Sequence, residues 1–172
     1  MKFPRVARLD DTDEHVYERA AEVGEPAVTG SFQYTLSERD PARFAGKEKQ
    51  AFRHAFLGTH SFGHCTVVTV GDVTEVEYKA VIEALAQHLV EVWGAPSLAE
   101  ALPVARQEAE YAASLCAEHD SEASVVLALE RSVSADGGIQ EAFKTVQPRA
   151  RWDGERVRIW QIEEESPHDA KG

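Results

Sequence analysis

The chain has 172 residues, of which 43% are hydrophobic and 28% are charged, and its formal net charge is −12. A hydrophobic fraction of this size is typical of a single globular domain and excludes a chain that is disordered throughout. The acidic net charge argues against duplex DNA or RNA as the main ligand, because neutralisation of phosphates supplies most of that affinity.

The N-terminal part of the chain predicts three strands. Residues 3–9 alternate apolar and basic side chains, which is typical of a half-buried strand. Residues 15–19 and 27–34 are the second and third predicted strands, and Gly24 and Pro26 separate them. Together these patterns predict that the chain begins with a group of short strands.

A helix and an interior strand are predicted next. Asp40 can cap the helix and Pro41 suits its first position, since proline has no amide hydrogen to leave unpaired. Apolar residues recur over 44–56, and Gly58 can end the helix. Residues 65–70 are rich in β-branched side chains and predict a central strand.

The middle of the chain carries the clearest helical signals. Thr74 and Glu77 have the spacing of a capping box, in which each side chain accepts a hydrogen bond from the other residue's amide. Apolar residues then recur at helical spacing until Gly94. Pro103 would break a helix interior, so the sequence predicts a short turn before it and a new helix over 103–116.

The C-terminal part predicts three more strands. Residues 124–130 and 139–146 flank a turn at 136–138, where two glycines accept the positive φ of a tight hairpin. Residues 156–162 alternate again and predict the last strand, and residues 163–172 form an acidic tail that we expect to be disordered.

This order of elements predicts an α+β fold. Strands that follow one another favour an antiparallel or mixed sheet, here of about six strands, with three or four helices packed on one face. We expect one domain over residues 1–162. The chain lacks the ~18 consecutive apolar residues of a membrane span, and no apolar run follows Met1–Arg5, so no signal peptide is expected.

Histidines and cysteines form the only candidate metal site. His60, His64 and Cys65 lie close together in the sequence, and Cys116 and His119 lie near the end of a predicted helix. If residues 60–65 are extended, neighbouring side chains point to opposite faces, and the two histidines are roughly 13 Å apart. We therefore predict no metal ion, and two free thiols in a reducing cytoplasm.

Catalytic motifs are absent from the sequence. The segment 58–63 lacks the spacing of a Gly-x-Ser-x-Gly elbow, and there is no glycine-rich loop for a phosphate. Pairs of acidic residues such as Glu108 and Glu110 are typical of a solvated surface. We therefore predict no catalytic residue and no cofactor, and a protein that is not an enzyme.

Charge is segregated along the chain. From Asp72 to Glu130 there are twelve acidic residues against Lys79 and Arg106, whereas residues 149–160 carry arginines interleaved with tryptophans. Such a mixture can bind single-stranded nucleic acid. We favour a basic strand that meets the acidic helices, within one chain or in a second copy.

Several segments resemble an uncharacterised family of small bacterial proteins that is catalogued only as a domain of unknown function. The similar segments are residues 2–9, 51–58, 61–63, 94–98, 139–143 and 148–150. The resemblance implies a stand-alone cytoplasmic protein, encoded near molybdenum-dependent oxidoreductases and their accessory factors. His64 and Cys65 depart from the family's pattern, which weakens a metal site built on them.

Three functions follow from this reading. The favoured one is a non-enzymatic accessory or interaction protein, expected to be a homodimer and to assist a metal- or molybdenum-dependent oxidoreductase system. The second is a small metal-binding protein or metal-dependent enzyme built on the histidine and cysteine residues. The third is a module that binds a small ligand between sheet and helices, in a pocket closed by Phe52, Phe56 and Trp93.

Overall fold

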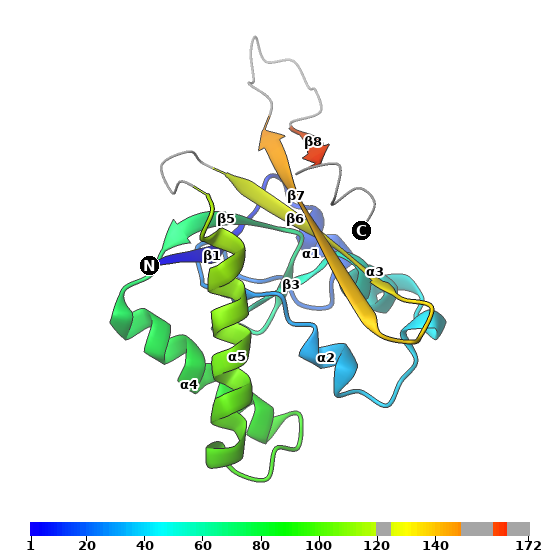
Figure 1. The fold of residues 1–172 in the computed structure, drawn as a ribbon. Coiled ribbons are helices and arrows are strands. Elements are labelled where there is room, and N and C mark those ends of the chain that lie inside the picture. Colours follow the sequence, from blue (N-terminus) through cyan, green and yellow to red (C-terminus); the bar gives the residue numbers. More distant parts are fainter. Residues whose placement is uncertain (120–124, 149–159, 165–172) are drawn as a thin grey trace.

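The described part of the chain forms two antiparallel β-sheets and five α-helices, so the predicted α+β class is confirmed (Figure 1). The computed structural model describes residues 1–119, 125–148 and 160–164. Within these ranges, no helix combines the length and the apolar character needed to cross a bilayer.

The larger sheet has five strands in the order β1-β5-β6-β7-β8, and every neighbouring pair is antiparallel. The strands are β1 (Lys2–Ala7), β5 (Val67–Asp72), β6 (Val126–Val133), β7 (Ile139–Pro148) and β8 (Trp160–Glu164). The β-branched strand β5 lies inside the sheet, as predicted. The predicted hairpin turn between β6 and β7 is also confirmed, with a φ of +91° at Gly137.

A smaller sheet continues from the edge of the larger one. Its strands are β2 (Ala27–Val28), β3 (Phe56–Gly58) and β4 (His64–Cys65), in that order. The Val6 amide donates to the Glu25 carbonyl, and the Gly24 amide donates to the Val6 carbonyl, both at 2.8 Å. The segment before β2 therefore covers the outer edge of β1 and joins the two sheets.

Two long helices, α4 (Glu75–Glu91) and α5 (Leu98–Cys116), pack against each other beside β1 (Figure 1). The predicted capping box of α4 is confirmed: the Glu77 amide donates to Thr74 Oγ1 and the Thr74 amide donates to Glu77 Oε1, both at 3.0 Å. Small side chains let the helices approach closely. The core residues that they share are Val81, Leu85, Leu89, Ala101, Ala105, Ala109 and Ala112.

Helices α5 and α3 both contact the same face of the large sheet. Leu127 and Leu129 of β6 pack in one cluster with Cys116 of α5. Arg131, on the same face because strand side chains alternate, donates to the Phe52 carbonyl of α3 (Gly46–His54) at 2.6 Å. A smaller apolar cluster on the opposite face comprises Val67, Val126, Ala128 and Val146.

The predicted strand at 15–19 is wrong. A short helix, α1 (Thr12–Val16), occupies this part of the chain. The Thr12 amide donates to Asp10 Oδ1 at 2.9 Å, and the buried Asp13 carboxylate accepts the Thr66 hydroxyl proton at 2.8 Å. A distant partner, Thr66, therefore fixes a conformation that the local pattern does not indicate.

The predicted strand at 27–34 is correct only at its start. Strand β2 ends at Val28, and the helix α2 (Phe32–Thr35) follows. Gly30 between them has a φ of +79°, and a Cβ atom there would lie 2.8 Å from Leu57 Cβ. This left-handed residue turns the chain away from the sheet.

The predicted helix from Asp40 to Gly58 is interrupted and shorter. Asp40 caps it as expected, accepting from the Ala42 amide at 3.0 Å, but only the 3₁₀ turn η1 (Pro41–Arg43) follows directly. Helix α3 starts after an extended break, and β3 begins at Phe56. At the end of α3, where the chain turns into β3, Arg131 donates hydrogen bonds to the carbonyls of Phe52 and Ala55.

Helix α5 continues through Pro103, so the predicted break there is wrong. The proline removes one hydrogen bond, to the carbonyl of Ala99, but Ala99 is exposed and water can solvate that carbonyl. The alanines packed against α4 keep the helix continuous.

The last strand also differs from its prediction. β8 includes Glu163 and Glu164, which the sequence assigns to the tail. Residues 156–159 of the predicted strand, the basic segment up to 159 and the tail residues 165–172 lie outside the described residues.

Candidate functional site

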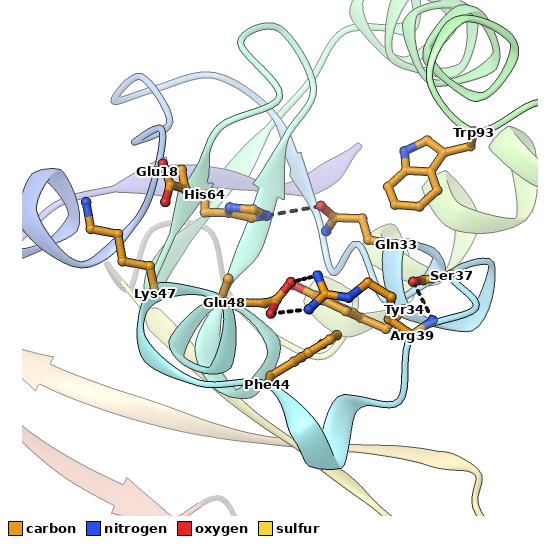
Figure 2. A pocket seen from close by; sticks show the side chains of 11 residues that line it. Glu18, Gln33, Tyr34, Ser37, Arg39, Phe44, Lys47, Glu48, His64 and Trp93 are labelled. Carbon is orange, nitrogen blue, oxygen red and sulfur yellow. Dashed lines mark hydrogen bonds and ion pairs between the residues drawn. The ribbon is translucent and has the colours of Figure 1, made fainter.

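A cavity of about 410 Å³ lies where α2, α3 and β4 meet the residues that follow α4 (Figure 2). Its lining combines aromatic, charged and amide side chains with one histidine. The lining residues are Glu18, Gln33, Tyr34, Ser37, Arg39, Phe44, Lys47, Glu48, Ala51, His64 and Trp93. Ligand cavities in proteins typically measure about 300–1,000 Å³ and have such mixed linings.

Aromatic rings that pack edge to face form one wall. Tyr34 of α2 lies 5.1 Å from the Phe52 ring centre at 89°, and Phe44 lies 6.0 Å from Phe52 at 75°. Rings packed this way hold each other in place. Trp93 adds a separate ring: it packs edge to face on Phe32 at 6.1 Å.

The indole of Trp93 is also held by a hydrogen bond. Its Nε1 donates to His88 Nε2 at 3.3 Å, and the His88 ring stacks on Phe62 with ring centres 3.9 Å apart. Phe62 has a positive φ of 55°, an unfavourable conformation for a non-glycine residue. The stack therefore fixes a strained loop residue and the tryptophan of the cavity together.

Two residues of the lining, Arg39 and Glu48, form an ion pair. Arg39 donates from both of its terminal nitrogens to the Glu48 carboxylate, at 2.8 Å for the Nη2–Oε1 bond (Figure 2). Its guanidinium lies 5.1 Å from the Phe44 ring centre. A two-bond pair of this kind is planar and directional, so it orients the charged groups of the lining.

His64 is locked in one tautomer by Gln33. Gln33 Nε2 donates to the Gly30 carbonyl at 2.9 Å, so its Oε1 faces His64 Nε2 at 3.0 Å (Figure 2). An amide oxygen only accepts, and the proton therefore resides on His64 Nε2. Burial, with Arg131 as a smaller cause, lowers the pKa of His64 to about 4. At neutral pH the ring is uncharged and Nδ1 is an acceptor.

Apart from the exposed side chains of Glu18 and Lys47, two polar groups of the lining have no hydrogen-bond partner among the described residues: His64 Nδ1 and the Tyr34 hydroxyl. Neither is sealed from solvent. The sealed side-chain atoms that lack a partner in the described ranges are Arg8 Nε, Thr29 Oγ1 and Glu108 Oε1. Burial raises the pKa of Tyr34 to about 12, so its hydroxyl keeps its proton and can donate.

Arg131 packs against the lining residue Tyr34 and was missed by sequence reasoning. It is 1% exposed and lies 5.0 Å from the Tyr34 ring centre. It donates to the carbonyls of Thr29 and Phe52 and pairs with Glu141 at 3.0 Å. The sequence does carry a signal for Arg131: it continues the inward-facing positions of Leu127 and Leu129 along β6, where another apolar side chain would be expected.

A second carboxyl group lies next to this ion pair. Burial, followed by repulsion from Glu141, raises the pKa of Glu108 to about 7. The Tyr111 hydroxyl donates to Glu141 Oε1 at 3.2 Å. Near neutral pH, Glu108 is therefore partly protonated, which reduces its repulsion of Glu141.

The five candidate metal ligands occupy different environments. Cys65 and Cys116 belong to one apolar core cluster, and burial raises the pKa of both thiols, for Cys116 to about 12. His64 lines the cavity, His60 is exposed, and the carbonyl of His119 accepts from Lys2 Nζ. No group of three or more histidine, cysteine or acidic residues able to hold a metal occurs in residues 1–119, 125–148 and 160–164.

The three aromatic residues predicted to close a pocket lie in different surroundings in the structure. Trp93 lines the cavity, as expected for a ligand module. Phe52 lies behind the wall, packed against Tyr34 and Phe44. Phe56 is fully buried and belongs to the core, where it contacts Phe143 with ring centres 6.5 Å apart.

Comparison with known proteins gives one match. A family model described as "Family of unknown function (DUF6505)" matches residues 1–159. The chain matches no curated protein and no solved structure.

Proposed function

Since the chain belongs to this family of unknown function, we propose from the geometry of the cavity that it is a binding protein for a small organic molecule. The observation that carries the proposal is the pair of unpartnered polar atoms, His64 Nδ1 and the Tyr34 hydroxyl, in a cavity of about 410 Å³ with aromatic walls. A lining with few polar groups of fixed direction is typical of a ligand site.

Contacts within the protein hold the polar groups of the site in place. Gln33 fixes the His64 ring, and Arg131 lies against Tyr34. Such support reduces the ordering cost that a ligand would otherwise meet on binding.

The test is recovery of a bound compound from the purified protein. The native protein is denatured and the released small molecules are compared by mass spectrometry with those from Ala51→Phe, whose larger side chain fills the cavity. Ala99→Phe, at an exposed position on α5, is the matched control. We expect a compound that the wild type and the control release and Ala51→Phe does not.

Absence of any such compound, together with absence of fragment-induced NMR shifts at the lining residues, would refute the proposal.

A second candidate is the accessory or interaction protein. It is supported by the surface of α4 and α5, where acidic residues accompany exposed apolar side chains, with Val92 61% and Leu98 47% exposed. The exposed acids of this surface are Glu83, Glu91, Glu100, Glu110 and Glu118. A cytoplasmic homodimer, and assistance to a molybdenum-dependent oxidoreductase system, are the finer forms of this candidate.

Native mass spectrometry tests the homodimer. Salt screens the attraction between exposed charges, so a dimer held by the acidic helices should weaken as the salt concentration rises. The double change Glu83→Lys and Glu91→Lys should abolish such a dimer. A monomer at all salt concentrations would remove the homodimer.

A further inference from the structure

We propose that the ligand of this cavity is an uncharged, planar ring compound that donates a hydrogen bond to His64 Nδ1 and accepts one from the Tyr34 hydroxyl. This inference rests on the proposed binding function and specifies its ligand class. Charge, hydrogen bonding and shape each lead to it.

The charges of the lining leave no unpaired ion inside the cavity. Arg39 and Glu48 neutralise each other through two hydrogen bonds. Glu18 and Lys47 are exposed side chains at the rim. A charged group buried without a partner is strongly unfavourable, so the enclosed part of the ligand is neutral. A charged substituent belongs at the rim, in water.

The polar atoms determine which groups the ligand carries. His64 Nδ1 offers a lone pair, because the proton of the ring is on Nε2 and faces Gln33 at 3.0 Å. An N–H or O–H of the ligand satisfies it, whereas a carboxylate would place lone pair against lone pair. The Tyr34 hydroxyl retains its proton and has no partner among the described residues, so it can donate to a carbonyl-type oxygen or a ring nitrogen.

The shape of the cavity favours a flat ligand. The rings of Tyr34, Phe44 and Trp93 all contribute to the lining. They are held by their edge-to-face contacts with Phe52 and Phe32. Flat faces bury the most area against a planar ring, and offset or edge-to-face contacts between aromatic rings add to this burial.

Four benzene derivatives of matched size test the class. Benzamide is neutral and has a donor and an acceptor, methyl benzoate is neutral and only accepts, benzoate is an anion and benzamidinium is a cation. Dissociation constants are measured at pH 7.5 from backbone amide NMR shifts of the full chain. We expect benzamide to bind most tightly, roughly fivefold better than methyl benzoate, because one net hydrogen bond contributes about 1 kcal/mol.

Variants assign the preference to its atoms. His64→Phe keeps a ring and removes Nδ1, so the advantage of benzamide over methyl benzoate should disappear. His60→Phe, at an exposed histidine outside the cavity, should leave it unchanged. Tyr34→Phe removes the donor to the ligand's oxygen, so it should weaken both neutral probes by a similar factor. This second variant tests the proposal if the first fails to fold.

The outcomes separate the two proposals. If benzoate or benzamidinium binds more tightly than benzamide, or if His64→Phe keeps the preference, the ligand class is wrong and the binding function stands. If none of the four probes shifts the lining residues and no compound is released by the purified protein, the binding function and the ligand class are both refuted.

Discussion

Replacing Arg131 by methionine should destabilise the fold more than any comparable surface change. The side chains of Arg131 and Glu141 are 0% and 8% exposed, and the guanidinium also donates to backbone carbonyls of Thr29, Phe52 and Ala55. Removing one partner of a buried ion pair costs about 3–5 kcal/mol, since the other charge remains buried. Each carbonyl left without a donor adds about 1–3 kcal/mol.

The lower ends of these ranges give an expected loss in free energy of unfolding for Arg131→Met of at least about 6 kcal/mol, a large part of the roughly 5–15 kcal/mol that stabilises a domain. The assay is urea unfolding followed by far-UV circular dichroism. If the variant is too unstable to measure, the double change Arg131→Met with Glu141→Gln should recover about 1–3 kcal/mol, because it removes the unpaired charge.

Arg53→Met is the matched control. Arg53 pairs with Glu130 at 3.2 Å, but the two side chains are 46% and 44% exposed. Such pairs contribute about 0–1 kcal/mol. If Arg131→Met is no more than about 1 kcal/mol less stable than Arg53→Met, the assignment of Arg131 as the central polar anchor is refuted.

Three further predictions concern single residues. Pro103→Ala restores the missing hydrogen bond to the Ala99 carbonyl inside α5 and should stabilise the fold by about 1 kcal/mol in urea unfolding; a loss of stability would contradict this account. Glu108 has a folded pKa of about 7 against an ordinary value of 4.5, so the folded state keeps a proton that the unfolded chain loses, and stability falls as pH rises between these values. Glu108→Gln should abolish this fall, which amounts to at most about 3 kcal/mol; an unchanged pH profile would refute the assignment. Gly58→Ala places a Cβ atom 2.5 Å from the Glu25 carboxyl carbon and should cost about 2 kcal/mol, measured by thermal unfolding; wild-type stability would show that Glu25 can move.

Local signals in the sequence predict the elements whose causes are local. The reciprocal bonds of Thr74 and Glu77 start α4 where the capping box indicates. The turn at Gly137 closes the β6–β7 hairpin in the predicted place. The helix over residues 12–16 and the early end of α3 depend instead on partners far along the chain, Thr66 and Arg131. No window of neighbouring residues contains that information.

The candidate site is less predictable than the fold for the same reason. Sequence reasoning identified His64 as a candidate residue, but as a metal ligand, because histidine beside cysteine is a common metal-binding pair. Its observed partner is Gln33, on another element. Trp93 was placed at a pocket correctly, whereas Arg39 and Tyr34 carry no local sign that they share a cavity with it.

The hydrogen bonds at the outer edge of β1 determine whether the small sheet can separate from the large one. The amides of Val6 and Gly24 tie the segment before β2 to β1. Separating the small sheet from the large one would therefore break a continuous backbone network, and the two sheets should share one cooperative unit in hydrogen exchange. These two amides should exchange as slowly as the most protected amides of β5.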